Sequence, residues 1–138
     1  MKTVSSMPQA IEIEINSHCN LACSYCPNSI DERVEKGNMD FGLYRTLLNQ
    51  LKKKKYSGRI AFDFYNEPTL AKNFDQYIKL AKEIVPACFL SLYTNGTQIK
   101  TLERSKELID IGFGEIVITK HEAVTELEIE KIYDEMPQ

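Results

Sequence analysis

Residues 11–26 have the sequence IEIEINSHCNLACSYC, in which alternating isoleucine and glutamate lead directly into a group of cysteines. Such a period of two is typical of a β-strand with one apolar face and one polar face. Cys19, Cys23 and Cys26 lie within eight residues, whereas the only other cysteine, Cys88, is far away in the sequence. We therefore predict a strand over residues 11–16 that leads into a loop of clustered thiols.

The remaining chain continues this strand with alternating helix-like and strand-like segments. The further strands are predicted in GRIAFDFYNEP at 58–68, CFLSLYTNG at 88–96 and EIVIT at 115–119. Helices are expected from Asp40 onward and over 74–85, 101–111 and 124–135. Strands that alternate with helices of this length form parallel βα units. We predict an α/β fold, a single domain over 1–138 with about four units, whose strand segments are 10–28 (with the cysteine loop), 58–70, 88–97 and 115–121.

The predicted strands have two distinct faces. The period of two puts on the apolar face Ile11, Ile13, Ile15, Ile60, Phe62, Phe64, Leu90, Leu92, Ile116 and Ile118. It puts on the polar face Glu12, Glu14, Asn16, Asp63, Tyr65, Glu67, Ser91, Tyr93, Asn95, Thr119 and His121. Parallel sheets are usually covered on both sides, so we expect the polar face to line a cavity. An open sheet with one solvated face is the alternative.

The carboxyl ends of the strands are where ligands bind in such α/β folds. The cysteine loop and the residues that end the other predicted strands should therefore surround one mouth. Those strand-end residues are Asn66, Glu67, Pro68, Thr94, Asn95, Gly96, Thr119 and His121.

Length, composition and charge exclude several classes of protein. The chain has 138 residues, 43% hydrophobic and 27% charged, which is ordinary for a globular domain. A net charge of −3 favours neither nucleic acid nor an anionic membrane, and the lysine run 52–55 fits a helix C-terminus. No membrane span or secretory signal is recognisable. We expect a cytoplasmic, reducing location, where clustered thiols hold metal more often than they form disulfides.

The cysteine spacing, Cys-x3-Cys-x2-Cys, leaves several kinds of site open. Thiolates suit iron–sulfur clusters and zinc. A structural zinc ion takes four ligands, and His18 could be the fourth, although the spacing differs from the usual zinc motifs. A [4Fe–4S] cube held by three thiolates would leave one iron open to a substrate or cofactor. Buried cysteines without a chemical role are the remaining interpretation, which their clustering in one loop disfavours.

Several motifs together resemble the radical S-adenosylmethionine (SAM) family. CNLACSYC resembles its Cys-x3-Cys-x-aromatic-Cys signature, with Tyr25 at the aromatic position. FYNEP resembles the Gly-Gly-Glu-Pro motif of the family, and YTNG ends the third strand as in many members. The resemblance runs from about residue 10 to 121 and is closest to the branch that holds the butirosin-pathway 2-deoxy-scyllo-inosamine dehydrogenase and its relatives.

The resemblance implies a fold, two cofactors and a reaction. The fold would be a partial (βα) barrel, with Cys19, Cys23 and Cys26 binding three irons of a [4Fe–4S] cluster and SAM binding the fourth. The residues expected to contact SAM are Tyr25, Asn66, Glu67, Pro68, Thr94, Asn95 and Thr119. Reductive cleavage of SAM would yield a 5′-deoxyadenosyl radical that oxidises a small polar substrate, such as an aminocyclitol or sugar alcohol. Epimerisation of a sugar carbon and modification of a peptide are the alternative reactions within the same branch. An external flavodoxin or ferredoxin would supply the electron, and His121 is a candidate substrate contact or proton carrier.

The chain also departs from the family pattern. Asn66 stands where the family has glycine, about four units are present instead of the usual six, and no cysteine follows Cys88 to build a second cluster. We therefore expect a missing C-terminal half, or self-association through an exposed edge strand. The alternative functions are a non-catalytic iron–sulfur or zinc-binding fragment, a partner-dependent half of an enzyme, and an ordinary doubly wound ligand-binding domain.

Overall fold

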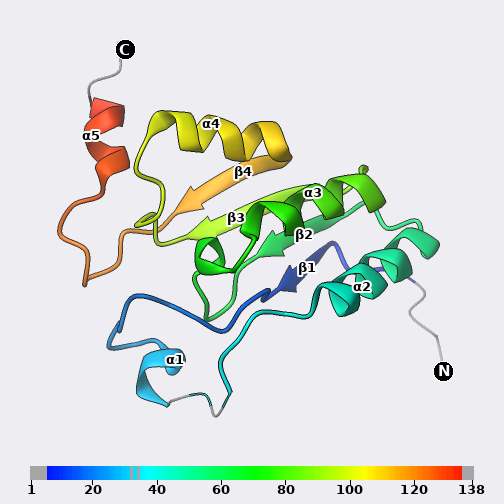
Figure 1. The fold of residues 1–138 in the computed structure, drawn as a ribbon, viewed down its shortest axis with the longest axis horizontal. Coiled ribbons are helices and arrows are strands. Elements are labelled where there is room, and N and C mark those ends of the chain that lie inside the picture. The colour runs from blue at the N-terminus through cyan, green and yellow to red at the C-terminus, as the bar shows by residue number, and fades with distance from the viewer. Residues whose placement is uncertain (1–5, 32, 34, 135–138) are drawn as a thin grey trace.

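Four parallel strands form one open sheet in the order β1-β2-β3-β4 (Figure 1). They are β1 (Ala10–Ile13), β2 (Arg59–Phe62), β3 (Phe89–Thr94) and β4 (Phe113–Ile118). The structure, a computed structural model, describes residues 6–31, 33 and 35–134. Neighbouring strands are also consecutive in the chain, so β1 and β4 are the two edges of the sheet. The predicted parallel α/β fold is confirmed.

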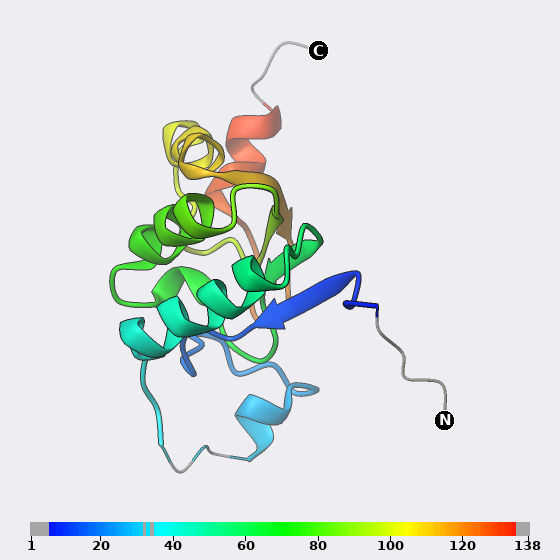
Figure 2. The ribbon, with the colours of Figure 1, turned by 90° about the vertical axis from the view of Figure 1, so that its right-hand side faces the viewer.

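Helices lie between and after the strands, and the longer ones cover one face of the sheet. Their bounds are α1 (Pro27–Ile30), α2 (Phe41–Lys53), the short 3₁₀ helix η1 (Pro68–Leu70), α3 (Phe74–Ile84), α4 (Leu102–Ile111) and α5 (Glu128–Asp134). Figure 2 shows α2, α3 and α4 side by side on the same side of the sheet. Asp40 caps α2 as expected, because its carboxylate accepts a hydrogen bond from the Leu43 N–H at 2.9 Å.

The apolar face of the strands forms the core with these helices. Ile60, Phe62 and Leu92 are completely buried there, as the alternation predicts. Phe113 joins the same face, because the register of β3 and β4 shifts between Leu90 and Ser91. This irregularity pairs Leu90 with Phe113 and Ser91 with Glu115, so the intervening Gly114 is extra. The Phe113 ring packs edge-on against Phe62, with ring centroids 5.6 Å apart.

The second strand is shorter than the sequence predicts, and one face assignment is wrong. β2 ends at Phe62, six residues before Pro68, so the alternation no longer applies beyond it. Phe64 has a φ of +133° and its side chain is 59% exposed, instead of lying in the core. A positive φ is strained for a residue with a side chain, and here the strain occurs where the chain turns away from the sheet.

Two other boundaries also differ from the predictions. β1 ends at Ile13 instead of residue 16, although Ile15 is still fully buried. The last helix begins at Glu128 instead of residue 124, and the predicted end at residue 135 lies outside the described residues. Within the part of the chain that the structure describes, no helix combines the length and apolarity that crossing a membrane requires.

Candidate functional site

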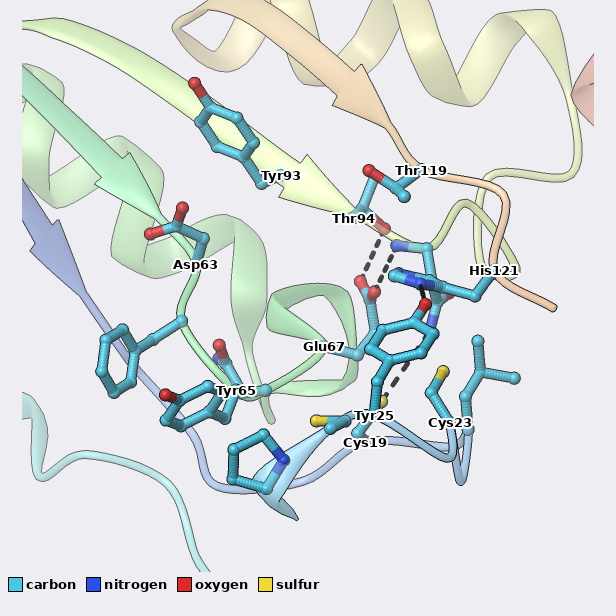
Figure 3. Close-up of a pocket in the computed structure, with 16 residues that line it drawn as sticks. Cys19, Cys23, Tyr25, Asp63, Tyr65, Glu67, Tyr93, Thr94, Thr119 and His121 are labelled. Atoms are coloured by element: carbon cyan, nitrogen blue, oxygen red, sulfur yellow. Dashed lines mark hydrogen bonds between the residues drawn. The ribbon is translucent and has the colours of Figure 1, made fainter. Parts of the chain in front are cut away.

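A pocket of about 310 Å³ opens at the carboxyl ends of the strands (Figure 3). The residues that line it are Cys19, Leu21, Cys23, Tyr25, Cys26, Pro27, Asp63, Phe64, Tyr65, Asn66, Glu67, Tyr93, Thr94, Asn95, Thr119 and His121. The structure thus brings together the three cysteines, Tyr25 and the expected strand-end residues, except Pro68 and Gly96. Pro68 is buried directly behind the pocket, where it begins η1. The predicted polar face lines this cavity only in part: Tyr93 of β3 and Asp63, which follows β2, are lining residues. The members of that face that do not line it are Glu12, Glu14, Asn16 and Ser91.

The three clustered cysteines all face this pocket as free thiols. Cys26 lies at the N-terminus of α1, with Pro27 as the first helical residue, and its N–H donates to the Cys23 carbonyl at 3.1 Å. Cys23 is buried, and partial burial raises the pKa of the Cys19 thiol. A compact turn therefore brings the three sulfur-bearing side chains of the loop to the same pocket.

Two observations bear on which metal group would fit. Within residues 6–31, 33 and 35–134, no three His, Cys, Asp or Glu side chains converge closely enough to share a single metal ion. His18, considered as a fourth zinc ligand, does not line this pocket but borders a second depression, which it shares with Cys19 and Ser29. Its backbone carbonyl instead accepts a hydrogen bond from the Glu67 N–H at 2.7 Å.

Cys88 has a different environment from the clustered cysteines. It is 3% exposed in the core, and its Sγ donates to the Tyr56 carbonyl at 3.4 Å. Burial raises the pKa of its thiol. Cys88 therefore packs as a small apolar side chain directly before β3.

Glu67 is the most buried charged residue that lines the pocket, at 1% exposure. Its Oε1 accepts from the Thr69 N–H, the Thr69 hydroxyl and the Thr94 hydroxyl, at 3.2, 2.5 and 2.6 Å. Its Oε2 accepts from the Asn95 N–H at 2.7 Å. One carboxylate therefore joins the end of β2 to the end of β3, because it satisfies donors on both segments. Whether it also contacts SAM stays a prediction.

Asn66 lies beside Glu67 and has an unsatisfied acceptor. Its Nδ2 donates to Asn16 Oδ1 at 2.5 Å, and Asn16 Nδ2 donates in turn to the Glu67 carbonyl at 3.1 Å. The Asn66 Oδ1 is buried without a hydrogen-bond partner, as is the Oδ1 of Asp63. Burial, together with the nearby charge of Glu12, raises the pKa of Asp63. Two unpaired acceptors among the pocket residues fit a ligand that carries hydrogen-bond donors, such as an ammonium group.

Asn95 connects the Glu67 side of the pocket to the cysteine loop. Its Nδ2 donates to Asn20 Oδ1 at 2.9 Å and lies 4.0 Å from Cys19 Sγ. Its Oδ1 accepts from the Thr97 N–H and hydroxyl at 3.0 and 2.7 Å. Gly96 follows with a φ of +76°, and a Cβ there would lie 2.6 Å from the Ile118 side chain. Glycine is therefore required sterically at position 96.

Residues after β4 form the wall opposite β1. The Thr119 N–H donates to the Thr94 carbonyl at 2.9 Å, which carries the sheet ladder one residue further. His121 Nδ1 and the Tyr25 hydroxyl form a hydrogen bond across the mouth, as Figure 3 shows. Glu122 accepts from Ser24, and these bonds lower its pKa.

Some residues of the site were not predicted from the sequence: Asn16 as a partner of Glu67, and Asn20, Ser24, Thr97 and Glu122. Asn20 and Ser24 lie between the cysteines, so their position in the loop is a local signal for them. Ser24 and Glu122 are 98 residues apart, and no sequence pattern connects such a pair.

Comparison with known proteins gives the following similarities. The Radical SAM superfamily profile matches residues 13–134. The S-adenosyl-L-methionine-dependent 2-deoxy-scyllo-inosamine dehydrogenase of Niallia circulans is 40% identical over 126 residues, which cover 91% of this chain and 50% of that protein. The tungsten-containing aldehyde ferredoxin oxidoreductase cofactor-modifying protein of Pyrococcus furiosus is 35% identical over 100 residues, 72% of this chain and 27% of the other.

Two solved structures are also similar to this chain. The crystal structure of BtrN in complex with AdoMet and 2-DOIA matches with a TM-score of 0.88 and 39% identity, over 96% of this chain and 53% of that one. BtrN in an open conformation matches with a TM-score of 0.79 and 38% identity, over 88% and 54%. The chain therefore spans about half the length of the dehydrogenase that it matches.

Proposed function

Because the chain belongs to the radical SAM superfamily, we propose that it holds a [4Fe–4S] cluster through Cys19, Cys23 and Cys26 and cleaves SAM reductively. The observation that carries this proposal is the pocket itself, where three free thiols face the polar ends of the strands. When bound, the cluster and SAM together supply a radical that abstracts a hydrogen atom from a substrate. The protein would bind, orient and shield these groups.

The chain's own side chains suggest how SAM would be oriented. The Asn66 Oδ1 is buried without a partner, so it is suited to accept a hydrogen bond from the SAM ammonium group. The Glu67 carboxyl group lies beside it, and its four hydrogen bonds to the chain fix its position. Pro68 begins η1 behind them, and Tyr25, Thr94, Asn95 and Thr119 would contact the remainder of the cofactor.

We further propose that the reaction is the dehydrogenation of a small polar substrate, such as an aminocyclitol or sugar alcohol. The support is the 40% identity with a 2-deoxy-scyllo-inosamine dehydrogenase. The raised pKa of Asp63 arises from burial beside another carboxylate, an environment that favours a cationic or hydroxyl-bearing partner. His121 is the candidate substrate contact at the mouth, and an external flavodoxin or ferredoxin in a reducing cytoplasm would supply electrons.

A second function is favoured by the length of the match. The chain spans 50% of the dehydrogenase, and β4 is an edge of the open sheet. Residues 1–138 would then be the N-terminal portion of a radical SAM barrel that needs a C-terminal half or a second copy for turnover. In that case the chain would bind an iron–sulfur cluster or zinc without catalysis.

Anaerobic reconstitution with iron and sulfide distinguishes these proposals. We expect a brown protein with about four irons per chain, which forms 5′-deoxyadenosine when dithionite and SAM are added. Cys23→Ala should lose both iron and product. Cys88→Ala is the matched control, because both thiols are buried but only Cys23 lines the pocket.

Each other outcome has a definite meaning. Iron uptake without 5′-deoxyadenosine would support the non-catalytic or partner-dependent function. Tight zinc binding with no iron uptake would contradict the cluster proposal. Equal loss of iron in Cys23→Ala and Cys88→Ala would show that the pocket thiols are not the ligands.

A further inference from the structure

The two outer edges of the sheet are connected across the pocket. β1 and β4 are separated by β2 and β3, yet the loop that follows β1 contacts the segment that follows β4. The Glu122 Oε1 accepts hydrogen bonds from the Ser24 N–H at 2.9 Å and from the Ser24 hydroxyl at 2.6 Å. Next to it, the Tyr25 hydroxyl contacts His121 Nδ1, as Figure 3 shows. The cysteine loop therefore crosses the carboxyl edge of the whole sheet.

The two ends of the cysteine loop are held in different ways. Its first part is fixed by a buried side chain, because Asn95, which is 4% exposed, donates to Asn20 beside Cys19. Its later part, Ser24 and Tyr25, is exposed, and Tyr25 is 59% exposed. The long-range side-chain contacts that the structure gives for these two residues go to the segment after β4.

The Ser24–Glu122 contact consists of charge-assisted hydrogen bonds with a defined geometry. Glu122 is ionised at neutral pH, and both donors of Ser24 converge on one of its oxygens. Hydrogen bonds to a charged acceptor are roughly twice as strong as neutral ones. Ser24 lies directly after the buried Cys23, whose carbonyl accepts from the Cys26 N–H, so a contact at Ser24 further restricts the backbone that carries the Cys23 sulfur. Loss of the contact would release the loop without exposing the core.

We propose that Ser24 and Glu122 form a latch that closes the later part of the cysteine loop over the pocket and thereby positions Cys23 and Tyr25. Both are positioning residues, since they act through the loop. The evidence for the latch is the pair of hydrogen bonds between Ser24 and Glu122, and it does not depend on the proposed function. Its consequence for SAM rests on the proposed function: a released loop would hold SAM less tightly, while the three thiols would remain available to the cluster.

The first test measures the latch in the chain without metal. Iodoacetamide alkylation followed by mass spectrometry gives separate rates for Cys23 and Cys88, which are both buried. We expect Glu122→Ala to raise the Cys23 rate about fivefold, as the loss of charge-assisted hydrogen bonds at an exposed site implies. The Cys88 rate should stay constant, because it reports opening of the core. Glu83→Ala, an exposed glutamate on α3, is the control and should change neither rate.

The pair also makes a prediction about double variants. Ser24→Ala removes one of the two donors, so it should raise the Cys23 rate less than Glu122→Ala does. The double variant should alkylate no faster than Glu122→Ala, because no acceptor remains for Ser24. An unchanged Cys23 rate in Glu122→Ala, an equal increase at Cys88, or additive effects in the double variant would each overturn the latch.

The second test measures the consequence for SAM in the reconstituted protein. We expect Glu122→Ala to keep its iron content and raise the Kd for SAM about fivefold, whereas Glu83→Ala changes neither. An unchanged Kd in Glu122→Ala, with SAM still bound by the parent chain, would overturn the positioning role. Failure of the parent chain to bind SAM would instead contradict the proposed function, and the alkylation rates would still decide whether the latch exists.

Discussion

The inner and outer parts of the pocket are held by different kinds of contact. The inner part is a buried network, which we call the Glu67 network: Asn16, Glu67, Thr69, Thr94 and Asn95. The outer part is the exposed latch between Ser24 and Glu122. Buried polar groups are costly to leave unpaired, while exposed ones regain hydrogen bonds from water. The inner part should therefore determine whether the pocket forms, and the outer part how firmly it closes.

The largest effect is expected from Glu67→Ala. This change leaves the donors of Thr94 and Asn95 buried without their acceptor. The free energy of unfolding in urea should fall by about 3 kcal/mol. Glu83→Ala is the exposed control and should leave it unchanged. A fall below about 1 kcal/mol would mean that water reaches the network and that the inner part is not rigid.

Asn95→Ala should have the next largest effect. It removes the side-chain bonds to Asn20 and Thr97, including the link between β3 and the cysteine loop. We expect a loss of about 2 kcal/mol in the free energy of unfolding. Thr97→Ala removes only one hydroxyl from the same group and should cost less. Equal losses in the two variants would show that the amide of Asn95 has no special role.

Phe64, at the rim of the pocket, allows a test of backbone strain, in contrast to the hydrogen bonds considered above. Its φ of +133° is unfavourable for any residue with a side chain, while the ring is 59% exposed. Phe64→Gly should therefore stabilise the chain by about 1 kcal/mol against urea. Phe64→Ala keeps the strained backbone and should give no gain. A gain of the same size in both variants would attribute the effect to the exposed ring.

The smallest effect on global stability is expected at the latch. Ser24→Ala and Glu122→Ala should leave the urea midpoint unchanged within error, because both side chains are exposed. The same variants should alter the alkylation of Cys23, as described above. A clear drop in the midpoint would remove the distinction between the inner and outer parts of the pocket.

Much of this arrangement could be predicted from short-range patterns. The alternation in residues 11–16 and the cysteine spacing depend on neighbours in the chain, and both indicated a thiol loop at the end of a strand. The alternation of apolar and polar residues gave the wrong face for Phe64, because β2 ends at Phe62. Nothing in the sequence FDFYNEP marks that end. Phe113 was missed because an irregularity beside β3 adds one residue to the pairing.

Side-chain contacts between residues far apart in the sequence could not be predicted from such short-range patterns. Glu67 was identified as a site residue, but its bonds to Thr94 and Asn95 require the register of β2 against β3. The bond between Ser24 and Glu122 depends on the two edges of the sheet lying within reach across the pocket. Only the folded arrangement brings those residues together.

The most direct test of the central claim is the electron paramagnetic resonance spectrum of the reduced, reconstituted chain with and without SAM. Three thiolates on a cube leave one iron for SAM, so the account predicts a cluster signal that shifts when SAM is added. Cys23→Ala should show no such signal, while Cys88→Ala should behave as the parent chain does. A cluster signal that is identical with and without SAM, or a chain that takes up no iron, would contradict the account.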